Sequence, residues 1–159
     1  MNATSAHASL NLRARTDEDW PSMLDVWVAS WRATYPEIDF EQRREWLVRH
    51  VHDLEAAGAV TLCLFDDRST LAGFVVINPA DGWLDQICVA PDGFGAGFGA
   101  SLLSAARTVS PKLIRLDVNA DNSRAIRFYE RAGFVRIGRG ANTLSGRETI
   151  VMEWRPDAE

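Results

Sequence analysis

The chain has 159 residues, 47% hydrophobic and 25% charged, which is the size and composition of one globular domain. No apolar run approaches the ~20 residues of a membrane-spanning helix, and the first residues lack the basic start and apolar stretch of a secretory signal, so we expect a cytoplasmic protein without a membrane partner. The net charge of −5 is uneven, because residues 1–91 carry 7 arginines against 14 acidic residues, and this acidic half argues against nucleic acid as a partner.

The first third of the chain predicts one strand and two helices. Residues 1–9 form an expected flexible leader, and the domain follows over residues 10–159. Alternating apolar residues predict a strand over 10–14. Thr16 then caps a helix whose first turn is acidic and which ends near Pro36. A second helix is predicted over 40–57, with a core stripe of Trp46, Leu47, Val51 and Leu54.

The remaining elements alternate between strands and helices. Strands are predicted over 60–65 and 71–77, which form a hairpin, and then over 83–89, 113–118, 134–139 and 147–154, with helices over 98–109 and 123–132. The order β-α-α-β-β-β-α-β-α-β-β indicates a single α+β domain with a mixed sheet. Cys63 and Cys88 each lie in an apolar run, so we expect two buried core thiols and neither a disulfide nor a metal site. His50 and His52 are two residues apart on different helix faces and do not make a metal pair.

The strongest local signal is a glycine-rich turn between a predicted strand and a predicted helix. It reads Val89-Ala90-Pro91-Asp92-Gly93-Phe94-Gly95-Ala96-Gly97-Phe98-Gly99-Ala100. Glycine lets the backbone approach a ligand closely, and the first turn of the helix offers unpaired N–H groups and the positive end of a dipole. This arrangement predicts a site for a pyrophosphate.

Two cofactor classes fit such a turn. Residues 95–100 also match the dinucleotide fingerprint, and Asp117 lies about 20 residues further on, where a ribose-binding acid belongs. Two observations count against a dinucleotide. The motif comes late in the chain, and the elements before it are two helices and a meander rather than βαβ units. A Walker P-loop is excluded because no Gly-Lys-Ser/Thr sequence follows.

A second motif, Asn122-Ser123-Arg124-Ala125-Ile126-Arg127-Phe128-Tyr129-Glu130-Arg131-Ala132-Gly133-Phe134, lies downstream of the turn. With both motifs in order, and with Leu102-Leu103 after the first, the chain resembles the GNAT superfamily of N-acyltransferases. The resemblance covers nearly the whole chain and is strongest from Trp83 to Phe134. It implies transfer of an acetyl group from acetyl-coenzyme A to a primary amine, without a metal.

The resemblance also implies roles for individual residues. The turn would hold the coenzyme A pyrophosphate through the amides of Gly95, Ala96, Gly97, Phe98, Gly99 and Ala100. The strand residues Ile87, Cys88 and Val89 would pair with the pantetheine arm. Asn122 would touch that arm, with Phe128 beside it and Tyr129 near the thioester sulfur. Phe94 departs from the family pattern, which has Gln or Arg there, and Arg124 or Arg127 are candidate substitutes for that phosphate contact.

The chemistry requires an acid and a base. An acceptor amine with an ordinary pKa of ~10.4 must lose a proton before it attacks, and Asp85, beside the cofactor strand, is the candidate general base. Alternation predicts that Asp85 shares a strand face with Trp83, Ile87 and Val89. The N–H near Val89 is the candidate oxyanion donor, and Tyr129 is the candidate acid for the leaving thiolate.

The acceptor is the least defined part of the prediction. Glu37 and Asp39, in the loop between the first two helices, and Trp83 are the candidate acceptor-binding residues. The sequence leaves open a polyamine, an amino acid, an antibiotic, a protein lysine or an N-terminus. A non-catalytic acyl-coenzyme A sensor and, less favoured, a dinucleotide-dependent oxidoreductase remain the alternatives, and a homodimer is compatible with the tryptophan content.

Overall fold

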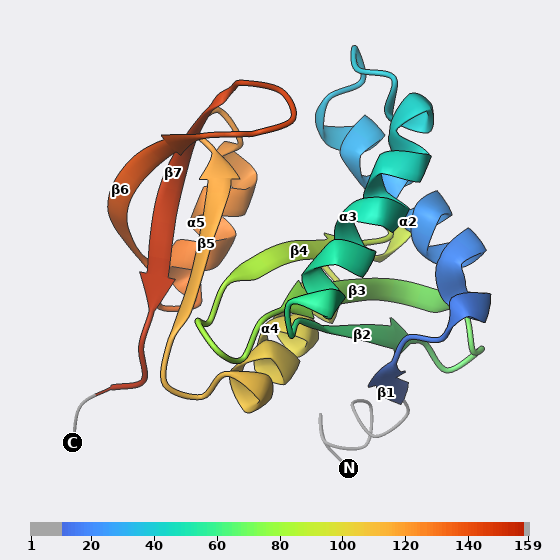
Figure 1. Ribbon diagram of the computed structural model, residues 1–159, viewed down its shortest axis with the longest axis horizontal. Coiled ribbons are helices and arrows are strands. Elements are labelled where there is room, and N and C mark those ends of the chain that lie inside the picture. The colour runs from blue at the N-terminus through green and yellow to red at the C-terminus, as the bar shows by residue number, and fades with distance from the viewer. Residues whose placement is uncertain (1–10, 158–159) are drawn as a thin grey trace.

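The structure is a computed structural model that describes residues 11–157 (Figure 1). In chain order the elements are β1 (Asn11–Ala14), η1 (Asp17–Asp19), α2 (Trp20–Thr34), η2 (Phe40–Arg43), α3 (Arg44–Ala56), β2 (Val60–Phe65), β3 (Leu71–Ile77), β4 (Leu84–Val89), η3 (Pro91–Gly93), α4 (Phe98–Val109), β5 (Ile114–Asn119), α5 (Ser123–Arg131), β6 (Val135–Ala141) and β7 (Glu148–Trp154). This order confirms the predicted succession of strands and helices. The predicted leader lies outside the described residues. No helix within residues 11–157 is long and apolar enough to cross a bilayer.

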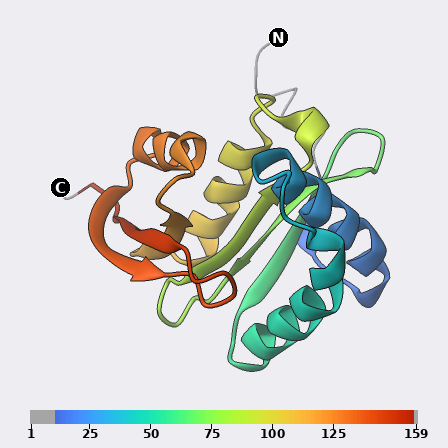
Figure 2. The same ribbon diagram turned by 90° about the horizontal axis from the view of Figure 1, so that it is seen from above.

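The strands form two sheets that contact each other at the start of β4 and β5 and diverge from there (Figures 1 and 2). One sheet has the order β1-β2-β3-β4 and the other the order β5-β7-β6, and every pairing within them is antiparallel. β4 and β5 touch only where they begin, through a parallel bridge between Trp83 and Arg115, whose N–H donates to the Gly82 carbonyl at 2.9 Å. Beyond that point the two strands separate. The α+β prediction is therefore confirmed, and the parallel sheet that a dinucleotide-binding domain requires is not formed by the described strands.

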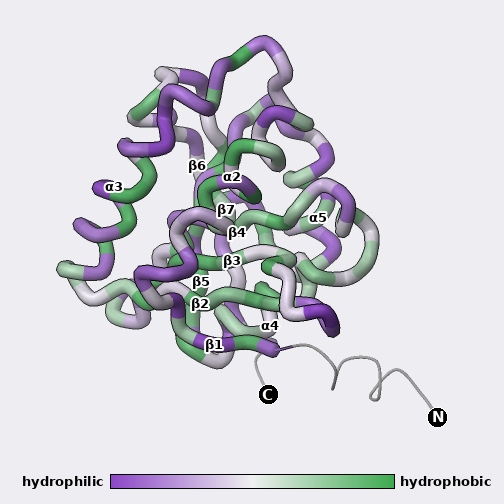
Figure 3. The backbone as a smooth tube through the Cα atoms, turned by 90° about the vertical axis from the view of Figure 1, so that its right-hand side faces the viewer, coloured by the Kyte–Doolittle hydropathy of each residue, from purple (hydrophilic) through white to green (hydrophobic). Residues whose placement is uncertain are grey.

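Helices cover the first sheet on both faces, and this burial produces two apolar cores (Figure 2). Alternate residues of β3 point to opposite faces, because successive strand side chains do so. Phe74 and Val76 pack with α2 and α3, whereas Val75 and Ile77 pack with α4 and the second sheet. Helix α3 also has one apolar and one polar side, and its polar residues lie on its outer side (Figure 3). Leu47 and Val51 of the predicted stripe are fully buried against the sheet. The prediction of two buried, unpaired cysteines is also confirmed.

A β-bulge interrupts the pairing of β4 with β3. Val76 lies opposite Gln86 and Ile77 lies opposite Leu84, so Asp85 is an additional residue on β4 without its own partner. A bulge turns the extra side chain away from simple alternation. The prediction that Asp85 shares the face of Ile87 and Val89 was therefore wrong: its carboxylate bonds to His50 of α3, on the opposite side of the sheet from α4.

Candidate active site

The separation of β4 from β5 opens a cleft of about 500 Å³. One wall is β4, the other is β5 with α5, and the glycine-rich turn at the start of α4 closes one end. Among the predicted cofactor-binding residues, eleven line this cleft: Ile87, Val89, Phe94, Gly95, Gly97, Phe98, Gly99, Ala100, Asn122, Phe128 and Tyr129. Tyr129 is also the predicted acid, and the predicted base Asp85 lines the cleft as well. The structure thus brings together residues that lie up to 44 positions apart in the sequence.

The backbone of the turn holds amide groups toward this cleft. Gly95 and Gly97 have φ angles of +83° and +90°, a left-handed conformation that side chains disfavour, and Gly97 is the N-cap of α4. Within the described residues no backbone acceptor is recorded for the N–H groups of Gly95, Gly97, Phe98, Gly99 or Ala100. These amides and the dipole of α4 can receive an anion, so the geometry of the turn is compatible with the predicted pyrophosphate site.

Two predicted cofactor contacts are used differently in the structure. The Ala96 N–H donates to the Gly93 carbonyl at 3.1 Å and is engaged within the turn itself. The Cys88 side chain points away from the cleft, with its thiol 3.7 Å from the Val26 carbonyl oxygen, and burial raises its pKa to about 12. The main chain of Cys88 is opposite Phe74 and faces β3, so the open edge of β4 is formed by the main-chain groups of Ile87 and Val89.

Phe94 stands where the family pattern has Gln or Arg, and in the structure a basic side chain lies beside it. The Arg124 guanidinium lies over the Phe94 ring, with its central carbon 4.0 Å from the ring centroid, and both residues line the cleft. Arg127 is exposed and does not line it. Of the two arginines that the sequence offered as substitutes for the missing basic side chain, Arg124 is therefore the one that lies at the cleft.

Helix α5 presents the predicted acid to the same cleft. Asn122 caps the helix by accepting a hydrogen bond from the Ala125 N–H at 3.3 Å. Tyr129 is 7% exposed, and burial, together with the nearby Asp117 carboxylate, raises its pKa above the ordinary value of 10. Its phenol is thus protonated at neutral pH, and no hydrogen-bond partner is recorded for it in residues 11–157.

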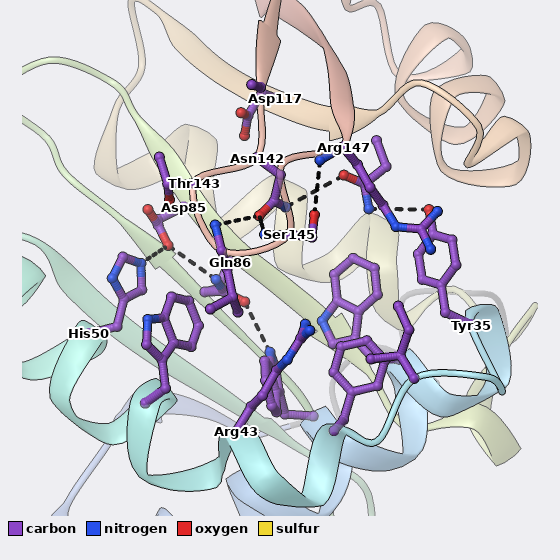
Figure 4. A pocket seen from close by; sticks show the side chains of 18 of the residues that line it. Tyr35, Arg43, His50, Asp85, Gln86, Asp117, Asn142, Thr143, Ser145 and Arg147 are labelled. Atoms are coloured by element: carbon purple, nitrogen blue, oxygen red, sulfur yellow. Dashed lines mark hydrogen bonds and ion pairs between the residues drawn. The ribbon is translucent and has the colours of Figure 1, made fainter.

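A second pocket of about 240 Å³ adjoins the cleft (Figure 4). Aromatic side chains form one part of its wall, and polar side chains of β4 and β5 form another. The loop between β6 and β7, which carries Asn142, Ser145 and Arg147, completes the lining. The aromatic residues are Trp27, Trp31, Tyr35, Phe40, Trp46 and Trp83. Trp46, predicted as core, is only partly buried and forms part of this wall, whereas Trp83 lies here as predicted. Asp85, Gln86, Asp117 and Asn119 line both cavities, so the two spaces meet where β4 and β5 part.

An imidazole–carboxylate pair stands at this junction. His50 Nε2 lies 2.7 Å from Asp85 Oδ1, which also accepts a hydrogen bond from the Gln86 side chain at 3.1 Å. Trp46 stacks on the imidazole with 4.5 Å between ring centroids and fixes its orientation (Figure 4). The hydrogen bond to Asp85 raises the pKa of His50 above 6.5, although partial burial opposes the shift. Sequence reasoning missed this pair, because its members are 35 residues apart and only the bulge turns Asp85 toward α3.

Other polar groups of the pocket are bound to one another. The Tyr35 hydroxyl donates to Asp121 at 2.6 Å and accepts from the Asn119 side chain at 3.1 Å. Arg147 pairs with Asp121 at 2.9 Å and with Glu37 at 3.4 Å. Asp117 faces the junction from β5, where burial and the charge of Asp85 raise its pKa.

The two predicted acceptor-binding carboxylates do not line the pocket. Glu37 is exposed and held by Arg147, and Asp39 caps η2 by accepting from the Glu41 N–H at 3.1 Å. The loop that carries them does border the pocket, but through Tyr35, Ile38 and Phe40. The predicted loop therefore borders the pocket without its two carboxylates, because Arg147, which binds Glu37, comes from the far end of the chain.

Comparisons with known proteins agree with this geometry. The model of the Acetyltransferase (GNAT) family matches residues 20–134. The chain is 28% identical to the peptidyl-lysine N-acetyltransferase YjaB of Salmonella typhimurium, covering 82% of this chain and 86% of that one. It is 27% identical to the peptidyl-lysine N-acetyltransferase YiaC of Escherichia coli, covering 90% and 95%. Among solved structures, the PaiA N-acetyltransferase of Thermoplasma acidophilum in complex with coenzyme A superimposes with a TM-score of 0.74 at 23% identity, covering 92% and 99%.

Proposed function

Since the chain belongs to the GNAT family of acetyltransferases and acts as an N-acetyltransferase of amines, we propose that acetyl-coenzyme A binds between β4 and β5 and that a primary amine enters the aromatic pocket. One observation carries the proposal: the two cavities share Asp85, Gln86, Asp117 and Asn119, so a thioester in one and an amine in the other would meet at these residues. Holding both reactants at one point supplies much of the acceleration of a two-substrate reaction.

The cleft fits a thioester carrier on two grounds. For five amides of the turn, those of Gly95 and of residues 97–100, no backbone acceptor is recorded within residues 11–157, and these amides suit a diphosphate. Among the described strands, none pairs with the β4 edge facing β5 beyond Trp83, so an extended arm can add to it as a strand would. When bound, acetyl-coenzyme A supplies an activated acetyl group and a thiolate leaving group.

We assign the removal of the amine proton to the Asp85–His50 pair. In its neutral-imidazole state the pair carries one negative charge, faces the acceptor pocket and can take up one proton, which comes to rest on the imidazole. The amine nitrogen then forms the new bond to the acetyl carbon. The Val89 N–H, on the open edge of β4, is the proposed donor to the carbonyl oxygen as it gains charge.

Tyr129 completes the proposed reaction. Its phenol is protonated at neutral pH and lines the cleft near Asp117, so it can donate a proton to the sulfur as the bond between sulfur and the acetyl carbon breaks. As the sulfur leaves, the attacking nitrogen loses its second proton, which restores the Tyr129 phenol through solvent. The products are an amide and coenzyme A, and the proton held by the Asp85–His50 pair returns to solvent.

The test measures thiol release from acetyl-coenzyme A in the presence of a panel of primary amines, with mass detection of the acetylated product. We expect turnover with the wild-type protein and a loss of about 100-fold or more in kcat for Asp85→Asn. Asp67→Asn, in the exposed turn between β2 and β3, is the matched control and should keep full activity. Saturable binding of acetyl-coenzyme A without turnover on any amine would instead support a sensor.

A further inference from the structure

The proposed acceptor pocket holds a guanidinium and an acid–base pair at separate positions. Arg43 is the last residue of η2 and the N-cap of α3, and Trp46 and His50 follow it on α3 at intervals of three and four residues. All three line the pocket, and in Figure 4 Arg43 enters it between His50 and Tyr35. A rise of 1.5 Å per residue separates Arg43 from His50 by about 10 Å along the helix direction. His50 holds the Asp85 carboxylate, so the Arg43 guanidinium and this acid–base pair face the pocket from different positions.

Arg43 differs from its neighbours in having no carboxylate partner among the described residues. Arg44 pairs with Glu41 and Asp25, and Arg147 pairs with Asp121 and Glu37. The Arg43 guanidinium instead lies 5.1 Å from the Phe40 ring centroid, inside the aromatic wall. A ligand with a second positive charge would meet this cation, whereas an anionic group would find an unneutralised partner that offers five N–H donors.

One wall of the pocket is aromatic. Trp27 packs against Phe40 and Trp46 there, with centroid separations of 5.6 and 6.3 Å. Flat aromatic faces favour an aliphatic or aromatic body against this wall, whereas the polar side chains of Asn119, Asn142 and Ser145 line other parts of the pocket. A volume of about 240 Å³ suits a small molecule rather than a folded protein segment.

We propose that the natural acceptor is a small ω-amino acid: a primary amine joined by an apolar chain or ring to an anionic group. The amine lies at the Asp85–His50 pair, the body lies against Trp46 and its aromatic neighbours, and the anion binds Arg43. This inference rests on the proposed function but narrows it, because it disfavours polyamines and unmodified lysine side chains as preferred acceptors.

Three probes with the same five-methylene chain test the proposal: 6-aminohexanoate, hexylamine and 1,5-diaminopentane. They end in a carboxylate, a methyl group and an ammonium group. We expect kcat/KM to fall in that order, with at least about tenfold between the first and the last, because one charge-assisted contact is gained by the first and a like-charge contact is imposed on the last. A lysine peptide with an acidic neighbouring residue is the fourth arm, and its clear preference over 6-aminohexanoate would overturn the small-molecule assignment.

Variants of Arg43 test whether this residue causes the preference for an acceptor that carries a carboxylate. Arg43→Gln should lower the ratio of kcat/KM for 6-aminohexanoate over hexylamine about tenfold, mainly through KM. Arg43→Lys should restore part of this ratio, and Arg43→Glu should reverse it toward 1,5-diaminopentane. Arg49→Gln, an exposed arginine of α3 outside the pocket, is the matched control. An unchanged ratio in Arg43→Gln refutes the inference while amine acetylation stands, whereas the absence of turnover on every probe refutes the proposed function itself.

Discussion

Replacing Arg124 tests how this protein compensates for Phe94. The guanidinium lies 4.0 Å from the Phe94 ring centroid at the edge of the cleft, where it can meet the diphosphate beside the turn amides. A charge-assisted hydrogen bond contributes about 1.5–3 kcal/mol. Because Arg124 is exposed and the turn amides remain, we take the lower end, so Arg124→Ala should weaken coenzyme A binding about tenfold.

Phe94 contributes by holding the guanidinium in place. A cation–π contact at an exposed site contributes about 0.5–1 kcal/mol, so Phe94→Ala should weaken binding only about two- to fivefold. The two effects should not add in the double variant, because the ring acts through the arginine. Once Arg124 is absent, replacing Phe94 should weaken coenzyme A binding little further.

The assay is calorimetric titration of each variant with coenzyme A and with dephospho-coenzyme A, which lacks the 3′-phosphate. If Arg124 contacts the diphosphate, Arg124→Ala should also weaken the binding of dephospho-coenzyme A about tenfold. Arg127→Ala, on the same helix but outside the cleft, is the control. Binding by Arg124→Ala within twofold of the wild type, or an equal loss in Arg127→Ala, would refute the reasoning.

Three further predictions concern the acid, the base and the stability of the first helix. In the wild type kcat should fall as the pH drops through the pKa of His50, which Asp85 raises above 6.5; in His50→Gln this acid limb should move toward the carboxylate range near ~4, with the same amine used for both proteins. An unmoved limb would exclude the imidazole from the titration. Tyr129→Phe should lower kcat about 100-fold while the melting temperature changes little, since no hydrogen bond of its hydroxyl is recorded within residues 11–157; full kcat would remove Tyr129 as the acid. The hydrogen bonds from Arg13, at 2.8 and 2.9 Å, lower the pKa of Asp19 from 3.8 to about 2, so this carboxylate stabilises the fold above pH ~4 and the contribution disappears as the pH falls through 2. Asp19→Asn should therefore cost about 1–2 kcal/mol in urea unfolding at pH 7 and almost nothing near pH 2, and a cost independent of pH would contradict the assignment.

Local patterns predicted the elements, but not the contacts that depend on register. The hydrophobic periods of α2, β3 and α4 are set by each segment's own residues, so their bounds could be predicted closely. The bulge at Asp85 arises from the way β4 pairs with β3, and no glycine or proline marks it within the strand. The sequence therefore indicated Asp85 as the candidate base but placed its side chain on the wrong face, and local patterns did not predict His50 as its partner.

Local sequence patterns also did not predict the ion pairs between residues that lie far apart in the chain. Glu37 and Asp39 were identified from their position in the loop, but Arg147, 110 residues from Glu37, binds the first, and a local cap uses the second. The acidic character of the first half thus did not locate the acceptor's partners. One clue was available in the sequence: Trp46 and His50 are four residues apart, a spacing at which helix side chains stack.

The arrangement of the junction favours direct transfer from thioester to amine over a covalent acyl-enzyme. A covalent route needs a nucleophile that is exposed and readily ionised. Both cysteines are buried, and burial raises the pKa of each to about 12, so neither provides a thiolate at neutral pH. The polar side chains that line both cavities are carboxylates and amides, which accept protons or orient substrates, and the indole of Trp31 lies beside them. Because the sheet opens on both sides of these residues, the amine can approach the acetyl carbon without an intermediate carrier, and the separation of β4 from β5 creates both the cofactor cleft and the path of attack.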